Sequence, residues 1–135
     1  MSEIWTLGFV TSVLAAAISS GATLLYAALG ETLAERSGVL NLGVEGMMLV
    51  GALSGFAFCY WSESVWIGLL GAIVFGGLLA SIHALLVVGL RANQVVSGLA
   101  LTLFGQGVTA YMGASFVGKP APESFGRLAI PLLNE

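Results

Sequence analysis

The sequence predicts an all-α protein whose four helices cross a membrane, and three observations lead to this class. The 135 residues are 58% apolar, and their mean hydropathy is +1.01. Only 8% of the residues are charged, whereas a soluble domain carries roughly 25%. Long stretches without any charge follow one another along the chain, each about as long as a spanning helix requires. A water-soluble globular domain is therefore all but excluded.

The same composition argues against several other classes of protein. A disordered chain needs low hydrophobicity and high charge, which is the opposite of this sequence. Four Lys and Arg residues with a net charge of −3 cannot neutralise a run of phosphates, so we expect no nucleic acid partner. The single cysteine, Cys59, lies in an apolar stretch and is expected to be a buried structural thiol. No nucleophile–base pair or metal-ligand cluster is visible, so we expect neither an enzyme nor a cofactor.

The charge-free stretches give the helices in order. Three stretches of 27 residues and one of 17, residues 46–62, contain no charged side chain. A span needs about 20 residues, and 17 cover only about 25 Å of a hydrocarbon core near 30 Å. The second helix must therefore draw on the residues before position 46. We expect one transmembrane domain over residues 1–135, with helices at about 4–30, 39–62, 64–90 and 92–118.

Short polar segments connect these helices. Residues 31–36 are expected to form a solvated loop that leads into a turn at Ser37-Gly38. A tight hairpin at Glu63 joins the second and third helices. All three prolines lie in residues 119–135, which predicts an irregular extramembrane tail rather than a fifth helix.

The tryptophans support four crossings independently of hydropathy. Four crossings place the N-terminus, the Glu63 hairpin and the tail on one face of the membrane. Trp5, Trp61 and Trp66 all fall at that face, as an interfacial aromatic belt would place them. Each face carries two cationic side chains, so charge does not decide the orientation.

Small residues predict where helices pack together. The chain has 19 glycines, about twice the usual share. Small residues recur every fourth position along the second and third helices, a spacing that lets backbones approach closely in lipid. Packing within the chain and a subunit interface both fit the pattern, and Leu79 is expected to face lipid. The predicted packing residues are Gly51, Gly55, Gly68, Ala72, Gly76 and Ala80.

The start of the second helix carries the most informative polar residue. If this helix begins at residue 39, Glu45 lies about 9 Å along its axis. An ionisable group inside a membrane is costly unless it faces protein or water, and it indicates function by default. Gly43 and Gly46 permit a broken or re-entrant helix start, where transporters place substrate and ion sites. The alternative is that Glu45 only caps a helix start at the interface.

Other polar residues fit either hydrogen bonds between helices or a translocation pathway. Gln106 lies one turn beyond Thr102 on the same face of the fourth helix. His83, in an apolar helix, is expected to be a packing histidine rather than a proton relay. The candidates for a translocation pathway or gate are Asn41, Gly43, Glu45, Gly46, Asn93, Gln94 and Gln106.

Two motifs in these segments resemble a known family. Residues 35–48 read ERSGVLNLGVEGMM, and residues 91–98 read RANQVVSG. Both are similar to permease subunits of bacterial ABC importers of the nucleoside and simple-sugar (ribose-type) family. The ending AIPLL at residues 129–133 adds a weaker similarity. The resemblance extends from about residue 11 to the end of the sequence.

The resemblance implies a multi-pass subunit of the bacterial cytoplasmic (inner) membrane that pairs with a second permease subunit. A cytoplasmic ATP-binding subunit would hydrolyse ATP, and an extracytoplasmic substrate-binding lipoprotein would deliver the nucleoside or sugar. The resemblance also implies that the tryptophan face is extracytoplasmic. Family members are about twice as long, so we expect this chain to be the N-terminal half of such a permease.

Two other functions stay open from the residues themselves. A small four-helix multidrug exporter driven by proton exchange fits the length and the number of helices. Such exporters need a carboxylate in the first helix, and residues 4–30 contain none, so proton coupling would rest on Glu45. A non-transporting accessory membrane subunit also fits.

Overall fold

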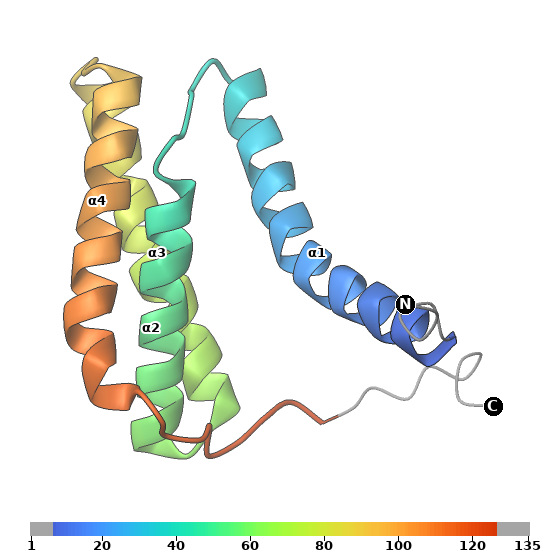
Figure 1. The fold of residues 1–135 in the computed structure, drawn as a ribbon. Helices are drawn as coiled ribbons and strands as arrows, with labels where there is room; N and C mark the ends of the chain where they lie inside the picture. The colour runs from blue at the N-terminus through green and yellow to red at the C-terminus, as the bar shows by residue number, and fades with distance from the viewer. Residues whose placement is uncertain (1–6, 127–135) are drawn as a thin grey trace. The chain divides into compact units, whose positions relative to one another are not determined.

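The computed structural model describes residues 7–126, and four long helices make up most of them (Figure 1). All four are long and apolar enough to cross a membrane, and no strand occurs in the described range, so the predicted all-α, multi-pass class is confirmed. The four helices are α1 (Leu7–Arg36), α2 (Val44–Ser62), α3 (Val65–Ala84) and α4 (Gln94–Gly113). The π-helix η2 (Leu85–Gly89) continues α3, and the 3₁₀ turn η3 (Ala114–Phe116) continues α4.

The chain divides into two compact units, residues 1–41 and residues 42–135. The first contains α1, and the second contains α2, α3 and α4. One transmembrane domain over residues 1–135 stays a prediction. Trp5 and Pro131 lie outside the described residues, and so does the second half of the predicted tail.

The end of α1 is six residues later than the sequence predicts, at Arg36 instead of residue 30. Residues 31–36 are therefore helical and do not form the expected loop. The chain turns after the helix at Gly38, whose φ of 82° is left-handed and suits glycine. The N–H of Gly38 donates to the carbonyl of Glu35 (2.9 Å), and the N–H of Val39 donates to that of Ala34 (3.0 Å). This Schellman motif confirms the predicted turn.

The start of α2 also differs from the prediction, because it lies at Val44 and not at residue 39. Leu42 and Gly43 form a turn just before it. The carbonyl of Leu42 accepts a hydrogen bond from Thr102 Oγ1 of α4 at 2.8 Å. In a helix that began at residue 39, this carbonyl would accept from the N–H of Gly46 instead. The contact with α4 therefore gives this carbonyl a partner outside its own helix.

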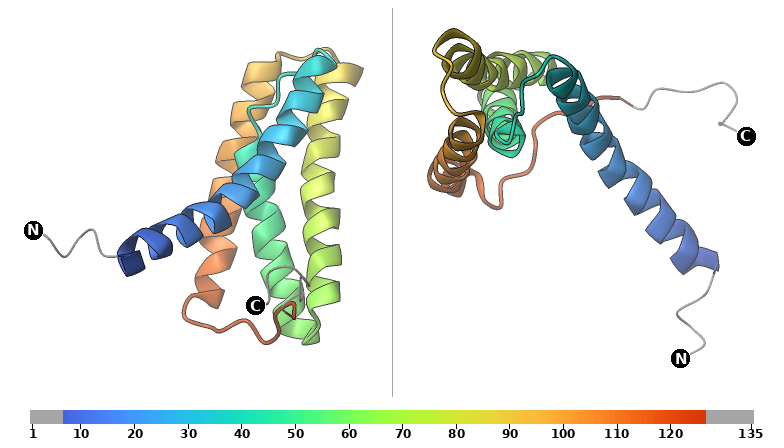
Figure 2. Two further views of the ribbon diagram at one scale, coloured as in Figure 1. Left: turned by 90° about the vertical axis from the view of Figure 1, so that its right-hand side faces the viewer. Right: turned by 90° about the horizontal axis from the view of Figure 1, so that it is seen from above.

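In the second unit, α2 packs against both α3 and α4 (Figure 2). Each helix gives one residue to a buried apolar cluster of Val50, Leu79 and Leu101, and Met47 packs against it. Leu79 is only 6% exposed, so the expectation that it faces lipid is wrong. A helix that is apolar all round does not reveal its buried side through its sequence pattern, because both sides read as hydrophobic.

The α2–α4 crossing brings two backbones into direct contact at Gly46 and Gly105. A Cβ on Gly105 would lie 2.5 Å from the Gly46 Cα, and a Cβ on Gly46 would overlap the carbonyl oxygen of Leu101. Real Cβ atoms do not come this close to backbone, so both positions require glycine. Leu101 and Gly105 are 7 and 11 residues into α4, roughly 10 to 17 Å from its start. The N-terminus of α2 therefore lies alongside the interior of α4 and not beside its first turn (Figure 1).

The two predicted stripes of small residues face each other between α2 and α3. The closest approach is at Gly68, where a Cβ would lie 2.7 Å from the carbonyl oxygen of Gly55. A Cβ on Gly76 would make only ordinary contact, 3.6 Å from the Met47 carbonyl oxygen, and Ala80 is exposed. The residues at this contact are Gly51, Gly55, Gly68, Ala72 and Gly76.

We predict that Gly105→Ala lowers the thermal stability of the bundle, because the added methyl overlaps the Gly46 backbone. Overpacking of this kind costs about 1–3 kcal/mol. Gly107→Ala is the matched control, since a Cβ there has no atom within 4 Å and alanine favours the helix. Thermal unfolding in detergent, followed by circular dichroism, compares the two. Equal melting temperatures would contradict the close crossing.

Candidate functional site

The α2–α4 crossing places a carboxylate next to an amide. Glu45, in the first turn of α2, is exposed, and its Oε1 accepts a hydrogen bond from Gln106 Nε2 at 3.4 Å. Gln106 is 12 residues into α4, roughly 18 Å from its start. Glu45 therefore lies beside the middle of α4, although it belongs to the first turn of its own helix. The N-terminal end of the α2 dipole stabilises its negative charge by about 0.3–1 kcal/mol.

A row of polar side chains follows this face of α4. Thr102, Gln106 and Thr109 are four and three residues apart, a spacing that puts them on one side of a helix. Thr102 bonds the carbonyl of Leu42, and Gln106 bonds Glu45. The Oγ1 of Thr109 is enclosed and has no hydrogen-bond partner within residues 7–126. The row thus continues past Gln106 to a hydroxyl group whose hydrogen-bonding capacity is unused.

Four of the seven predicted pathway residues come together at this crossing. Gly43 and Gly46 are buried there, beside the exposed Glu45 and Gln106. Gly43 lies against Gly98 of α4, where a Cβ would be 3.0 Å from the Gly43 nitrogen. The site therefore combines backbone held close by glycines with a carboxylate–amide pair.

The other three predicted pathway residues lie elsewhere. Asn93 caps α4, because its side chain accepts a hydrogen bond from the Val96 N–H at 3.1 Å. Asn93 and Gln94 are at the first turn of α4, roughly 20 Å along the helix from Gln106. Asn41 belongs to the first unit, where its N–H donates to Glu31 Oε1 at 2.9 Å. Glu31 is therefore engaged with backbone and is not the solvated side chain that was expected.

A second polar contact joins α3 and α4. His83 is 3% exposed, and its Nδ1 lies 3.0 Å from the hydroxyl of Ser97. The contact is one turn or less from η2, and π-helical segments are frequent at functional sites. The geometry is that of the expected packing histidine. Within residues 7–126, no three His, Cys, Asp or Glu side chains are grouped so that they could hold a metal ion.

Three residues of the site were not singled out from the sequence: Gly98, Gly105 and Thr109. Gly98 and Gly105 are seven residues apart and so lie on the same face of α4. This spacing was the available signal, and it would have predicted a close approach along α4. Thr109 extends the Thr102–Gln106 face by one turn and could have been found in the same way.

The fold and the site define a multi-pass helical membrane protein with an exposed carboxylate–amide contact between two of its helices. Residues 13–127 match the family described as the permease component of the branched-chain amino acid transport system, and the chain belongs to this family. No solved structure matches the chain.

Curated relatives agree with the family. The chain is 42% identical, over 95% of its length and 39% of the relative's, to a putative glucose ABC transporter permease protein of Haloferax volcanii. It is 34% identical to a guanosine ABC transporter permease protein of Bacillus subtilis, over 91% of this chain and 42% of that protein. A nucleoside ABC transporter permease protein of Lactococcus lactis is 31% identical over 82% of this chain and 38% of its own length.

These relatives confirm the resemblance that the two motifs carry. Their names describe permease proteins of sugar and nucleoside ABC transporters, and none describes an enzyme. The alternative of a proton-coupled multidrug exporter finds no support among them. The chain spans about two fifths of the length of these relatives.

We predict that Thr102→Val lowers the free energy of unfolding by about 1 kcal/mol, because the Leu42 carbonyl loses its hydrogen-bond donor. Valine keeps the shape of threonine, so the change tests the hydroxyl alone. Thr32→Val is the control: the Thr32 hydroxyl bonds the Ala28 carbonyl of its own helix, and its loss should be nearly silent. Thermal melting in detergent measures both variants. A Thr102→Val protein as stable as Thr32→Val would show that the α2 start does not depend on this bond.

Proposed function

We propose that this chain is part of the membrane-spanning permease subunit of an ATP-driven importer of nucleosides or related simple sugars. The observation that supports the proposal most is the match of residues 13–127 to a permease family. Relatives named for guanosine, nucleosides and glucose favour the substrate class. The membrane in this proposal is the bacterial cytoplasmic membrane.

The proposal includes three protein partners. A second permease subunit completes the pathway, a cytoplasmic ATP-binding subunit hydrolyses ATP, and an extracytoplasmic substrate-binding lipoprotein delivers the substrate. The hairpin at Glu63 and the end of α4 face the lipoprotein side. Trp61 and Phe116, whose rings are 5.9 Å apart, bring these two segments to the same end of the bundle.

The α2–α4 crossing supplies the polar part of the proposed pathway. Non-helical backbone at membrane depth is tolerated where it is buried in protein or lines a cavity. The backbone of Leu42 and Gly43 meets this condition through its contacts with Gly98 and Thr102. Glu45 and Gln106 are exposed beside it and held together by one long hydrogen bond of 3.4 Å. Such a bond is readily exchanged for bonds to the hydroxyl groups of a sugar or nucleoside.

Uptake of labelled substrates by the cells that carry the gene tests the proposed function. Deleting the gene that encodes the chain is expected to abolish import of labelled guanosine or of labelled glucose, and a plasmid copy is expected to restore it. Labelled leucine is included because the family description refers to branched-chain amino acids. Loss of leucine uptake alone would reassign the substrate class. Unchanged uptake of all three would contradict the proposal.

We predict that Glu45→Ala reduces uptake roughly tenfold in the assembled transporter while insertion and assembly persist. The substrate would lose its hydrogen bond to the Glu45 carboxylate, and a hydrogen bond to a charged group is worth about 1.5–3 kcal/mol. Glu45→Gln separates charge from hydrogen bonding: an amide that restores transport identifies a neutral hydrogen-bond partner. Glu35→Ala, in the exposed last turn of α1, is the control. A Glu45→Ala transporter with normal rate and affinity would reduce Glu45 to a helix-capping role.

A further inference from the structure

The chain that follows α4 returns across the end of the bundle. Gly118, with a left-handed φ of 79°, turns the backbone just after η3. Residues 117–126, here called the strap, then run from the end of α4 to the α2–α3 hairpin (Figure 1). No regular helix or strand forms within the strap, and side-chain contacts attach it to α2 and α3.

One contact of the strap caps a helix. Glu123 Oε2 accepts a hydrogen bond of 2.7 Å from the N–H of Val65, the first residue of α3 and 58 positions away in sequence. Ser64, at the N-cap position, makes no capping bond through its side chain. The Glu123 carboxylate takes over that role, and its charge also interacts favourably with the N-terminal end of the helix dipole.

Two further contacts hold the strap at its ends. Phe125 meets Trp66 edge to face, with ring centroids 5.4 Å apart and planes at 85°. Trp66 is 66% exposed, so this pair lies on the surface of α3 and outside the buried core. At the other end, the Lys119 ammonium lies 4.9 Å from the ring centroid of Tyr60.

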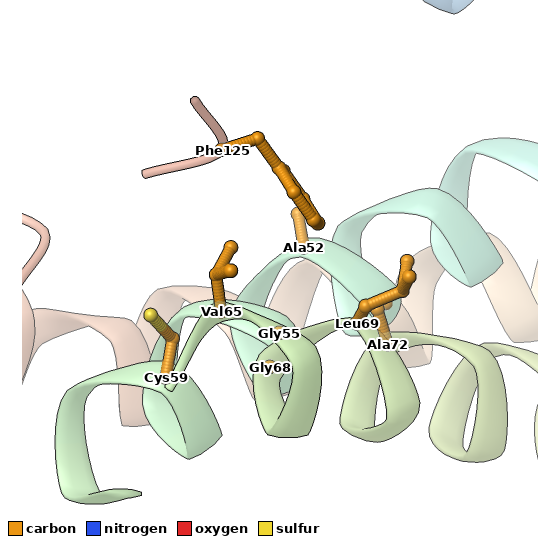
Figure 3. A pocket seen from close by; sticks show the side chains of 9 residues that line it. Ala52, Gly55, Cys59, Val65, Gly68, Leu69, Ala72 and Phe125 are labelled. Atoms are coloured by element: carbon orange, nitrogen blue, oxygen red, sulfur yellow. The ribbon is translucent and has the colours of Figure 1, made fainter. Parts of the chain in front are cut away.

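The strap borders a groove between α2 and α3. Gly55 and Gly68 form the floor of the groove, and Phe125 of the strap is part of its lining (Figure 3). Cys59 lines the same groove and is only 8% exposed. Its sulfur lies 3.9 Å from the backbone oxygen of Glu123, so the strap is one of the elements that shield the thiol.

We propose that the strap is a latch that opens by releasing Glu123 and Phe125 from α3 and so uncovers the groove. The hydrogen bond from Val65 to Glu123, the long contact of the Cys59 sulfur with the Glu123 carbonyl and one exposed ring pair hold this part of the strap, whereas many buried contacts hold the helices. Local opening requires far less free energy than unfolding where buried contacts are few. The latch therefore opens with the bundle intact, and Lys119 keeps the other end attached. The proposal is independent of the transported substrate.

Cys59 reports on the latch directly, because it is the only cysteine in the 135 residues. The rate at which a small neutral maleimide modifies it is measured by mass spectrometry on the full chain in membranes. We expect slow modification of the parent protein and modification roughly tenfold faster in Glu123→Ala and in Phe125→Ala. Glu123→Gln should give an intermediate rate, because its amide oxygen still accepts the bond from Val65 but carries no charge.

Glu63→Ala is the matched control, since it removes an exposed carboxylate from the same hairpin and should leave the rate unchanged. Circular dichroism checks that each variant keeps its helices, and Glu123→Gln and Phe125→Leu take the place of any alanine variant that does not. Variants that react at the parent rate would overturn the latch. A parent protein whose Cys59 reacts as fast as it does in the chain unfolded by a denaturing detergent would overturn the latch as well.

Discussion

The structure of the second unit depends on one backbone contact, that of Gly46 with Gly105. Neither position accommodates a Cβ, because the backbones of α2 and α4 are in direct contact there. This approach brings the turn before α2 against Gly98, and the carbonyl of Leu42 accepts a hydrogen bond from the Thr102 hydroxyl. The approach occurs just where α2 begins, at Val44, and it places Glu45 beside the middle of α4. The candidate site is a consequence of this packing.

Lipid changes the relative value of the interactions that hold such a bundle. Lipid tails are as apolar as leucine, so moving an apolar side chain from lipid into the bundle stabilises the bundle little. Close packing and hydrogen bonds between helices therefore contribute more to helix association. The described helices show both. Glycines face each other between α2 and α3 and between α2 and α4, and His83 bonds Ser97 between α3 and α4. An apolar chain with so many glycines is therefore suited to a permease, which must hold polar groups inside a membrane.

The two ends of the second unit are held by different kinds of contact. Near the start of α2, polar side chains meet across a backbone crossing that cannot widen without losing several contacts at once. At the hairpin end, the strap rests on surface contacts of Glu123, Phe125 and Lys119. Exposed contacts of this kind break locally at little cost, whereas the crossing moves only with its helices. Local motion at one end is therefore compatible with a fixed geometry at the other.

The sequence by itself determined the class of protein, the number of helices and the turn at Gly38, because hydrophobicity, charge and glycine conformation act locally. It also identified Glu45 as an ionisable residue near the start of a membrane-spanning helix, and it showed that small residues recur along α2 and α3. Only the tertiary structure decided where α2 begins, that Leu79 is buried and that Gln106 is the partner of Glu45, while Asn93 and Asn41 have other partners. The reason is physical: apolar side chains predominate on every side of these helices, and the polar row of α4 does not show which helix it faces, so the pattern does not mark the faces that meet. Which faces meet is decided by steric fit between glycines far apart in sequence.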